Sequence, residues 1–108
     1  MTEEANMDKE DFIKFLRGML KKIEDAELLL SQPIPKHIPA YHKILGIQQK
    51  LETIPCDVQK LFFVELIRVR GIITYFLNGK YVDGMKSLYL VKKRVIQLIK
   101  ENERDNNR

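Results

Sequence analysis

The fold of this chain is decided by residues 72–82, which read IITYFLNGKYV. An Asn-Gly pair between β-branched and aromatic residues is a strong signal for a β-hairpin. The same pair also suits a turn between two helices, because glycine readily adopts the left-handed conformation that ends a helix. We favour two helices. Residues 81–83 are too few for a convincing strand, and the apolar pattern from Asp83 onward has a helical period. The many β-branched residues of 64–76 favour the hairpin instead.

Apolar residues at helical spacing extend in both directions from this turn. Asp8 is a suitable N-cap for the first helix, and Pro39 suits the first turn of the second. Between them, residues 31–39 contain three prolines and predict a rigid, non-helical connector. The third segment is apolar nearly all round, so we expect it to be the central, buried helix. The pattern predicts helices over residues 8–30, 39–52, 56–77 and 81–102.

The predicted fold class is all-α, a four-helix antiparallel bundle with a Pro-rich connector between the first two helices. Residues 8–102 are expected to form a single helical domain. Residues 1–7 and 103–108 are expected to be a flexible N-terminus and a flexible tail. If residues 72–82 form a hairpin, the order of elements becomes that of a winged helix-turn-helix with a C-terminal helix.

Two local resemblances accompany these interpretations. Residues 54–58 (IPCDV) and 71–73 (GII) resemble the turn and the strand entry that flank the recognition helix of winged helix-turn-helix proteins. This resemblance implies a dimeric DNA-binding transcriptional regulator, with Gln59 or Lys60 on the recognition helix. Residues 75–84 look like the corner of a tetratricopeptide-like hairpin, with Gly84 where a small residue lets two helices approach. The sequence has no 34-residue repeat, so this second resemblance describes a local geometry only.

The charge of the chain is unevenly distributed. The formal net charge is +4, yet residues 36–100 contain twelve basic and four acidic residues. A basic body fits nucleic acid or an acidic partner, although lysine-rich helices also simply keep a small protein in solution. No aromatic residues are interleaved with the basic ones for base stacking, so nucleic-acid binding would tolerate many sequences.

The last helix carries the most regular basic pattern. Lys86, Lys93 and Lys100 recur every seven residues and line one outer stripe of a helix. Such a stripe can follow a phosphate backbone, although charged runs are usually a solvated face. Arg68 and Arg70 interrupt an apolar helix and need a partner, which Glu65, a bound acid or a phosphate would supply. The candidate nucleic-acid-binding residues are Arg68, Arg70, Lys86, Lys92, Lys93, Arg94, Lys100 and Arg104.

No arrangement of residues predicts catalysis or metal binding. His37, His42 and Cys56 show none of the spacings of zinc sites, and Cys56 is expected to be a small buried hydrophobe. We therefore expect no enzyme activity, metal, cofactor or small-molecule substrate. A single cysteine, no signal peptide and no long apolar run favour the cytoplasm, or the nucleus in a eukaryote, and no membrane partner.

The central segment is more apolar than four short helices easily cover. We therefore expect a non-enzymatic helical subunit or adaptor that assembles with itself or with a protein partner. Its basic face is suited to contact with a nucleic-acid backbone.

Overall fold

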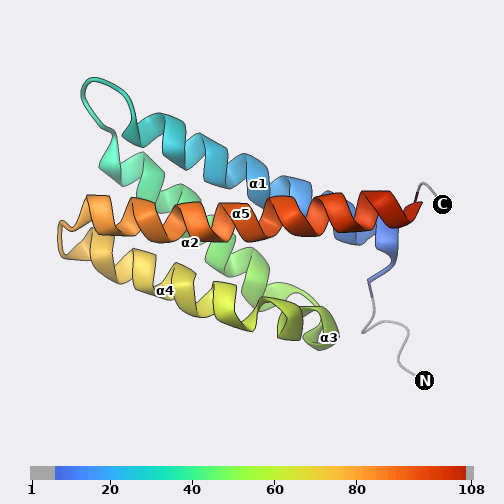
Figure 1. Ribbon diagram of the computed structural model, residues 1–108. Helices are drawn as coiled ribbons and strands as arrows, with labels where there is room; N and C mark the ends of the chain where they lie inside the picture. The colour runs from blue at the N-terminus through green and yellow to red at the C-terminus, as the bar shows by residue number, and fades with distance from the viewer. Residues whose placement is uncertain (1–6, 107–108) are drawn as a thin grey trace.

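The computed structural model describes residues 7–106, and these form four long α-helices and no strand (Figure 1). The predicted all-α class and helical bundle are confirmed. Within the described part, no helix has the length and apolarity that crossing a bilayer requires. The long helices are α1 (Lys9–Leu30), α2 (His37–Thr53), α4 (Phe63–Leu77) and α5 (Tyr81–Asn106). Between α2 and α4 lie the short helix α3 (Cys56–Gln59) and the 3-10 turn η2 (Lys60–Phe62).

The helix ends follow from local sequence. The Asp11 backbone N–H donates to Asp8 Oδ1 at 2.8 Å, so Asp8 is the N-cap of α1 as predicted. Helix α2 begins at His37, two residues earlier than predicted. Pro39 then lies in its first turn, where a missing N–H costs no intrahelical hydrogen bond. Helix α5 continues to Asn106, beyond the predicted end at residue 102.

The turn after Leu77 decides between the two predicted folds. Gly79 has φ +73°, and its N–H donates to the Phe76 carbonyl oxygen at 3.1 Å. The Lys80 N–H donates to the Tyr75 carbonyl oxygen at 2.8 Å. These two bonds form a Schellman motif, which satisfies the last carbonyl groups of α4. Residues on both sides of the turn are helical, so the winged helix-turn-helix alternative is wrong.

The four long helices form a ring. Helix α1 packs against α2 and α5, and α4 packs against the same two helices. In Figure 1 the chain runs in one direction along α1 and α4 and in the other along α2 and α5. The ring surrounds one apolar core, whose fully buried residues include Leu16, Met19, Ile23, Ile44, Ile47, Leu51, Phe62, Val69, Ile72, Leu88, Val91 and Val95.

This packing corrects the prediction that residues 56–77 form a central helix buried on every side. Helix α4 has two main neighbours, so Val69 and Ile72 are buried while Phe63 and Ile67 are exposed. An apolar composition all round does not make a helix central when the ring leaves one of its faces uncovered.

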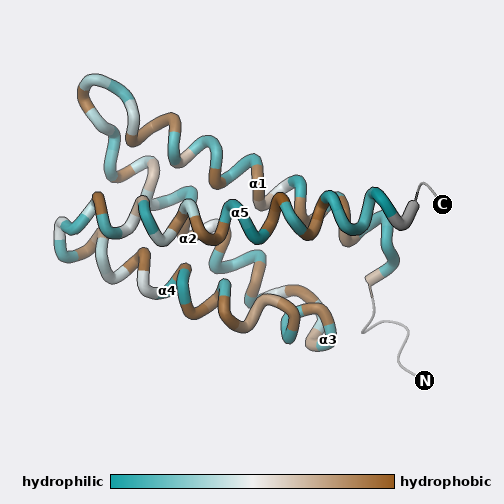
Figure 2. Tube along the Cα trace, viewed as in Figure 1, coloured by the Kyte–Doolittle hydropathy of each residue, from teal (hydrophilic) through white to brown (hydrophobic). Residues whose placement is uncertain are grey.

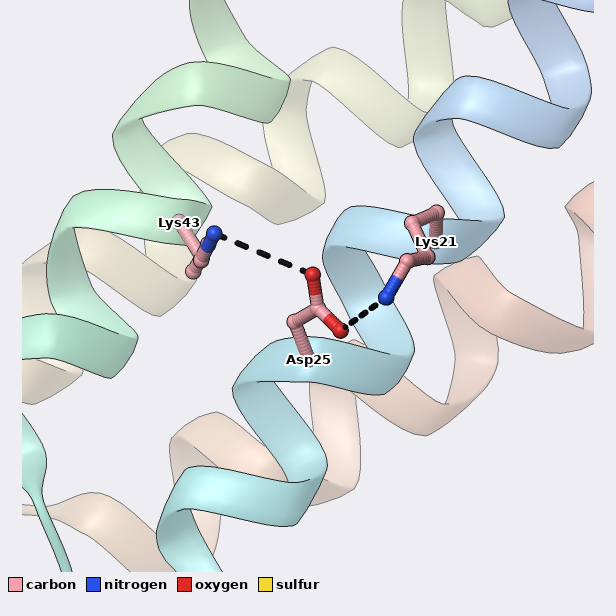
Figure 3. A network of polar contacts seen from close by, with 3 residues as sticks. All are labelled: Lys21, Asp25 and Lys43. Atoms are coloured by element: carbon pink, nitrogen blue, oxygen red, sulfur yellow. Dashed lines mark hydrogen bonds and ion pairs between the residues drawn. The ribbon is translucent and has the colours of Figure 1, made fainter.

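Charged contacts join neighbouring helices at the surface. Lys21 Nζ donates to Asp25 Oδ1 at 2.8 Å within α1, and Lys43 Nζ of α2 lies 3.7 Å from Asp25 Oδ2 (Figure 3). The hydrogen bond from Lys21 holds the pKa of Asp25 below its ordinary value. Arg17 and Glu103 form an ion pair that joins α1 to α5. Exposed pairs of this kind add little stability, but opposite charges on facing helices favour this arrangement over others.

Candidate interaction surfaces

The first candidate surface is an exposed apolar patch on η2 and α4. Leu61, Phe63, Val64 and Ile67 are between 52% and 65% exposed, and we call them the α4 apolar face. Residues three and four apart share one side of a helix, so Phe63, Val64 and Ile67 point outward together. Figure 2 shows the first half of α4 mainly in brown, the colour of hydrophobic residues.

Single exposed apolar residues are common on proteins, whereas contiguous ones mark contact sites. Fully covering a side chain of this kind is worth about 1.5–3 kcal/mol. The four residues of the α4 apolar face therefore hold several kcal/mol of hydrophobic free energy that intramolecular packing does not use. The sequence predicted that an apolar face would remain uncovered, but not which residues form it.

The charges beside this face are positive. Lys60 and Arg68 are exposed and form no ion pair within residues 7–106. Arg70 Nη2 instead donates to Glu52 Oε2 of α2 at 3.0 Å. Glu65 is the only acid between Lys60 and Leu77, and its side chain is buried. The partner that the sequence offered for these arginines, Glu65, pairs with neither of them in the described residues.

The second candidate surface is the basic stripe on α5. Lys86, Lys93, Lys100 and Arg104 are exposed, and none of them forms an ion pair in the described chain. Lys93 Nζ lies 5.7 Å from the centroid of the Tyr89 ring, within the range of a cation–π contact. Tyr89 is 54% exposed, so the expectation that no aromatic residue lies among the basic ones is wrong. We call these four cations the α5 basic stripe.

The remaining two predicted residues of α5 lie beside this stripe. Lys92 Nζ donates to Glu27 Oε1 of α1 at 2.8 Å, and this hydrogen bond raises the pKa of Lys92. Arg94 is half-buried and has no ion pair among the described residues. Lys92 and Arg70 are therefore occupied inside the protein, while the other predicted cations keep their charges available.

The third candidate surface is a shallow groove of about 300 Å³ at the end of the bundle that carries the α4–α5 turn. The His37 and Tyr81 rings stack with centroids 3.7 Å apart at 16°, and Phe76 meets Tyr81 edge-on at 5.3 Å and 86°. The lining residues are His37, Ile38, Tyr41, His42, Phe76, Leu77 and Tyr81.

Sequence reasoning considered the two histidines only as metal ligands and missed this groove. The sequence did contain one signal, because His37 and Tyr41 are four residues apart and would share one side of a helix. That signal applies only if the helix begins before Pro39, as α2 does. Among the described residues, no group of three or more His, Cys, Asp or Glu side chains is placed to hold a metal ion.

Cys56 is exposed, so the expectation of a buried cysteine is wrong. It begins the short helix α3, from which Val58 is the residue that enters the core.

The described part of the chain is thus an all-α bundle with an apolar face, a basic stripe and a shallow end groove. Comparison with protein-family models, with curated proteins and with solved structures finds no match for this chain. Its function is therefore argued from these surfaces.

Proposed function

We propose that this chain is a non-enzymatic helical adaptor or assembly subunit that binds a protein through the α4 apolar face. The observation that carries the proposal is the exposure of Phe63, Val64 and Ile67 on successive turns of a helix whose other side forms the core. A folded domain gains nothing from keeping such side chains in water, whereas a partner that covers them gains their transfer free energy.

The composition of the face also fits a protein interface. Aromatic and arginine side chains are enriched at interfaces and supply much of their binding energy. Phe63, which is 65% exposed, is the natural anchor of such an interface. Arg68 lies five residues further along the same helix. Aliphatic residues beside Phe63 exclude water from such an anchor.

A pair of aspartate substitutions tests this proposal. In the cells that make this protein, tagged chains carrying Ile67→Asp are expected to lose at least about tenfold of the protein that copurifies with the native chain, because a charge in a buried interface is costly. Leu28→Asp is the matched control, since Leu28 is an aliphatic residue that is 65% exposed, against 52% for Ile67, but lies on α1. Equal recovery with both variants, at unchanged helical circular dichroism, would argue against the α4 apolar face as the binding site.

We propose contact with a nucleic-acid backbone as a second candidate function, favoured by the four cations of the α5 basic stripe, which are unpaired in the described part of the chain. Each phosphate that a cation neutralises makes the affinity for duplex DNA fall with salt, with a slope of about −0.9 in a log–log plot. The double variant Lys93→Ala/Lys100→Ala removes two such contacts. The salt dependence of its affinity for duplex DNA is therefore expected to be shallower, with a slope smaller in magnitude by about 2. Lys14→Ala/Lys36→Ala removes two exposed lysines elsewhere and is the control. A salt slope that the α5 double variant leaves unchanged would end this second proposal.

A further inference from the structure

We infer that the occupant of the α4 apolar face is an amphipathic helix of a different protein, with acidic residues bordering its apolar stripe. This inference rests on the proposed protein-binding function and adds the chemistry of the partner. It is drawn from the charges that border the face and from the exposed surfaces that a second copy of this chain offers.

The α4 apolar face has a cation at each end. Arg68 lies four residues after Val64 on α4, so the two share one side of that helix. Lys60 lies in η2, next to Leu61 in the chain. Both cations are exposed and unpaired within residues 7–106. A partner that covers the apolar residues meets these charges, and acids beside its own apolar stripe would pair with them.

Charge complementarity argues against a second copy in this position. If two α4 helices packed face to face in parallel, Arg68 would lie against Arg68. In the opposite direction, Arg68 would lie near the start of the other α4, where η2 carries Lys60. Either arrangement brings like charges together beside an apolar contact, which suppresses binding.

The other exposed apolar groups of the chain are no better matched. Ile38 and Leu77, at the end groove, are accompanied by Lys36 and Lys80. Tyr89 and Leu90 lie within one turn of Lys86 and Lys93 on α5, and Val82 lies between Lys80 and Asp83 in the chain. Leu28 is the single large exposed hydrophobic residue of α1, and Ile34 lies two residues before Lys36 in the connector. Within the described residues, a second copy thus offers no apolar stripe bordered mainly by acids.

Nucleic acid is also a poor occupant of this face. Phosphates would satisfy Lys60 and Arg68, but the aliphatic side chains between them have no hydrogen-bonding groups for bases and would remain in water. An α-helix presents apolar side chains at the same i, i+3 and i+4 spacing as the face itself, so it covers both kinds of group at once.

Photo-crosslinking identifies the occupant. The full chain, with benzoylphenylalanine in place of Phe63, is irradiated in the cells that make it, and the crosslinked residues are identified by mass spectrometry. The same reagent in place of Leu28 is the control. The expected product joins position 63 to a segment of another protein with apolar residues at helical spacing and acids beside them.

The affinity of that segment, made as a peptide, then tests the charges. Arg68→Glu is expected to weaken binding by about tenfold or more, whereas Lys14→Glu, the same charge change on α1, is expected to change it less than about twofold. Replacing the facing acid of the peptide with lysine is expected to restore binding to Arg68→Glu. Equal binding to the native chain and to Arg68→Glu would overturn the inference.

The crosslinking outcomes separate the two proposals. A crosslink to a second copy, or to a protein segment without acids, overturns this inference and leaves protein binding at the α4 apolar face standing. A crosslink to nucleic acid, or no crosslink beyond that of the control, overturns both.

Discussion

Replacing Phe62 with alanine is expected to lower the free energy of unfolding by about 3–5 kcal/mol. The Phe62 side chain is fully buried, and its ring centroid lies 5.7 Å from that of Phe15 and 6.1 Å from that of Phe12. Alanine would leave a cavity between η2 and α1 that the surrounding helices fill only in part. Because small domains are stable by about 5–15 kcal/mol, this loss is a large share of the total.

The neighbouring residue provides the control. Phe63 is 65% exposed, so Phe63→Ala removes the same atoms from water rather than from the core. Its effect on the free energy of unfolding is expected to stay within about 0.5 kcal/mol. Urea denaturation followed by circular dichroism measures both variants. Similar midpoints for the two would contradict the orientation of α4 described above.

Alanine at Gly84 is expected to destabilise the protein by about 1–2 kcal/mol, although alanine is the better helix former. A Cβ atom at Gly84 would lie 2.6 Å from Phe76 Cε1 and 2.8 Å from Phe76 Cδ1. The Phe76 ring is itself buried and packed against Tyr81, so it has little room to move. Helices α4 and α5 would have to separate where the chain turns between them.

Alanine at Gly71 is expected to have the opposite effect. Among residues 7–106, no heavy atom of another element lies within 4 Å of a Cβ atom built there, and Gly71 is inside α4. Gly71→Ala should therefore stabilise the protein by about 0.5–1 kcal/mol through helix propensity alone. Thermal unfolding of the two variants gives the comparison. If both raise the melting temperature, Gly84 is not a point of close helix contact.

The features that were predictable from the sequence depend on neighbours along the chain. Asp8 caps α1 because its side chain reaches an N–H three residues on. Gly79 ends α4 because a left-handed residue is needed there, and Gly84 follows within one turn of the next helix. The outward position of the α5 basic stripe was also predictable, because it depends only on the seven-residue spacing of its lysines along one helix.

The features that were not predictable depend on residues far apart in the sequence. Lys92 pairs with Glu27 across 65 residues, and Arg70 pairs with Glu52 across 18. Spacing along the chain cannot identify these partners, and it suggested Glu65 as a partner of Arg70 instead of Glu52. The buried side of α4 depends on which helices occupy the neighbouring positions of the ring, because its sequence is apolar in nearly every direction.

The end groove shows the same limit. It requires the stack of His37, at the start of α2, on Tyr81, at the start of α5. Neither ring is distinctive in the sequence, since isolated histidines and tyrosines are common on helices. The two rings meet because the turn at Gly79 brings α5 back along α4, and α4 packs against α2.

Carbene footprinting of the native complex tests most directly whether the α4 apolar face binds a protein. The reagent labels exposed side chains, and its yield at each residue is compared between the purified chain and the chain in its native complex. Phe63 and Ile67 are expected to lose most of their labelling in the complex, while Leu28 keeps its own. Unchanged labelling of Phe63 and Ile67 in a complex that still contains the partner would contradict the account.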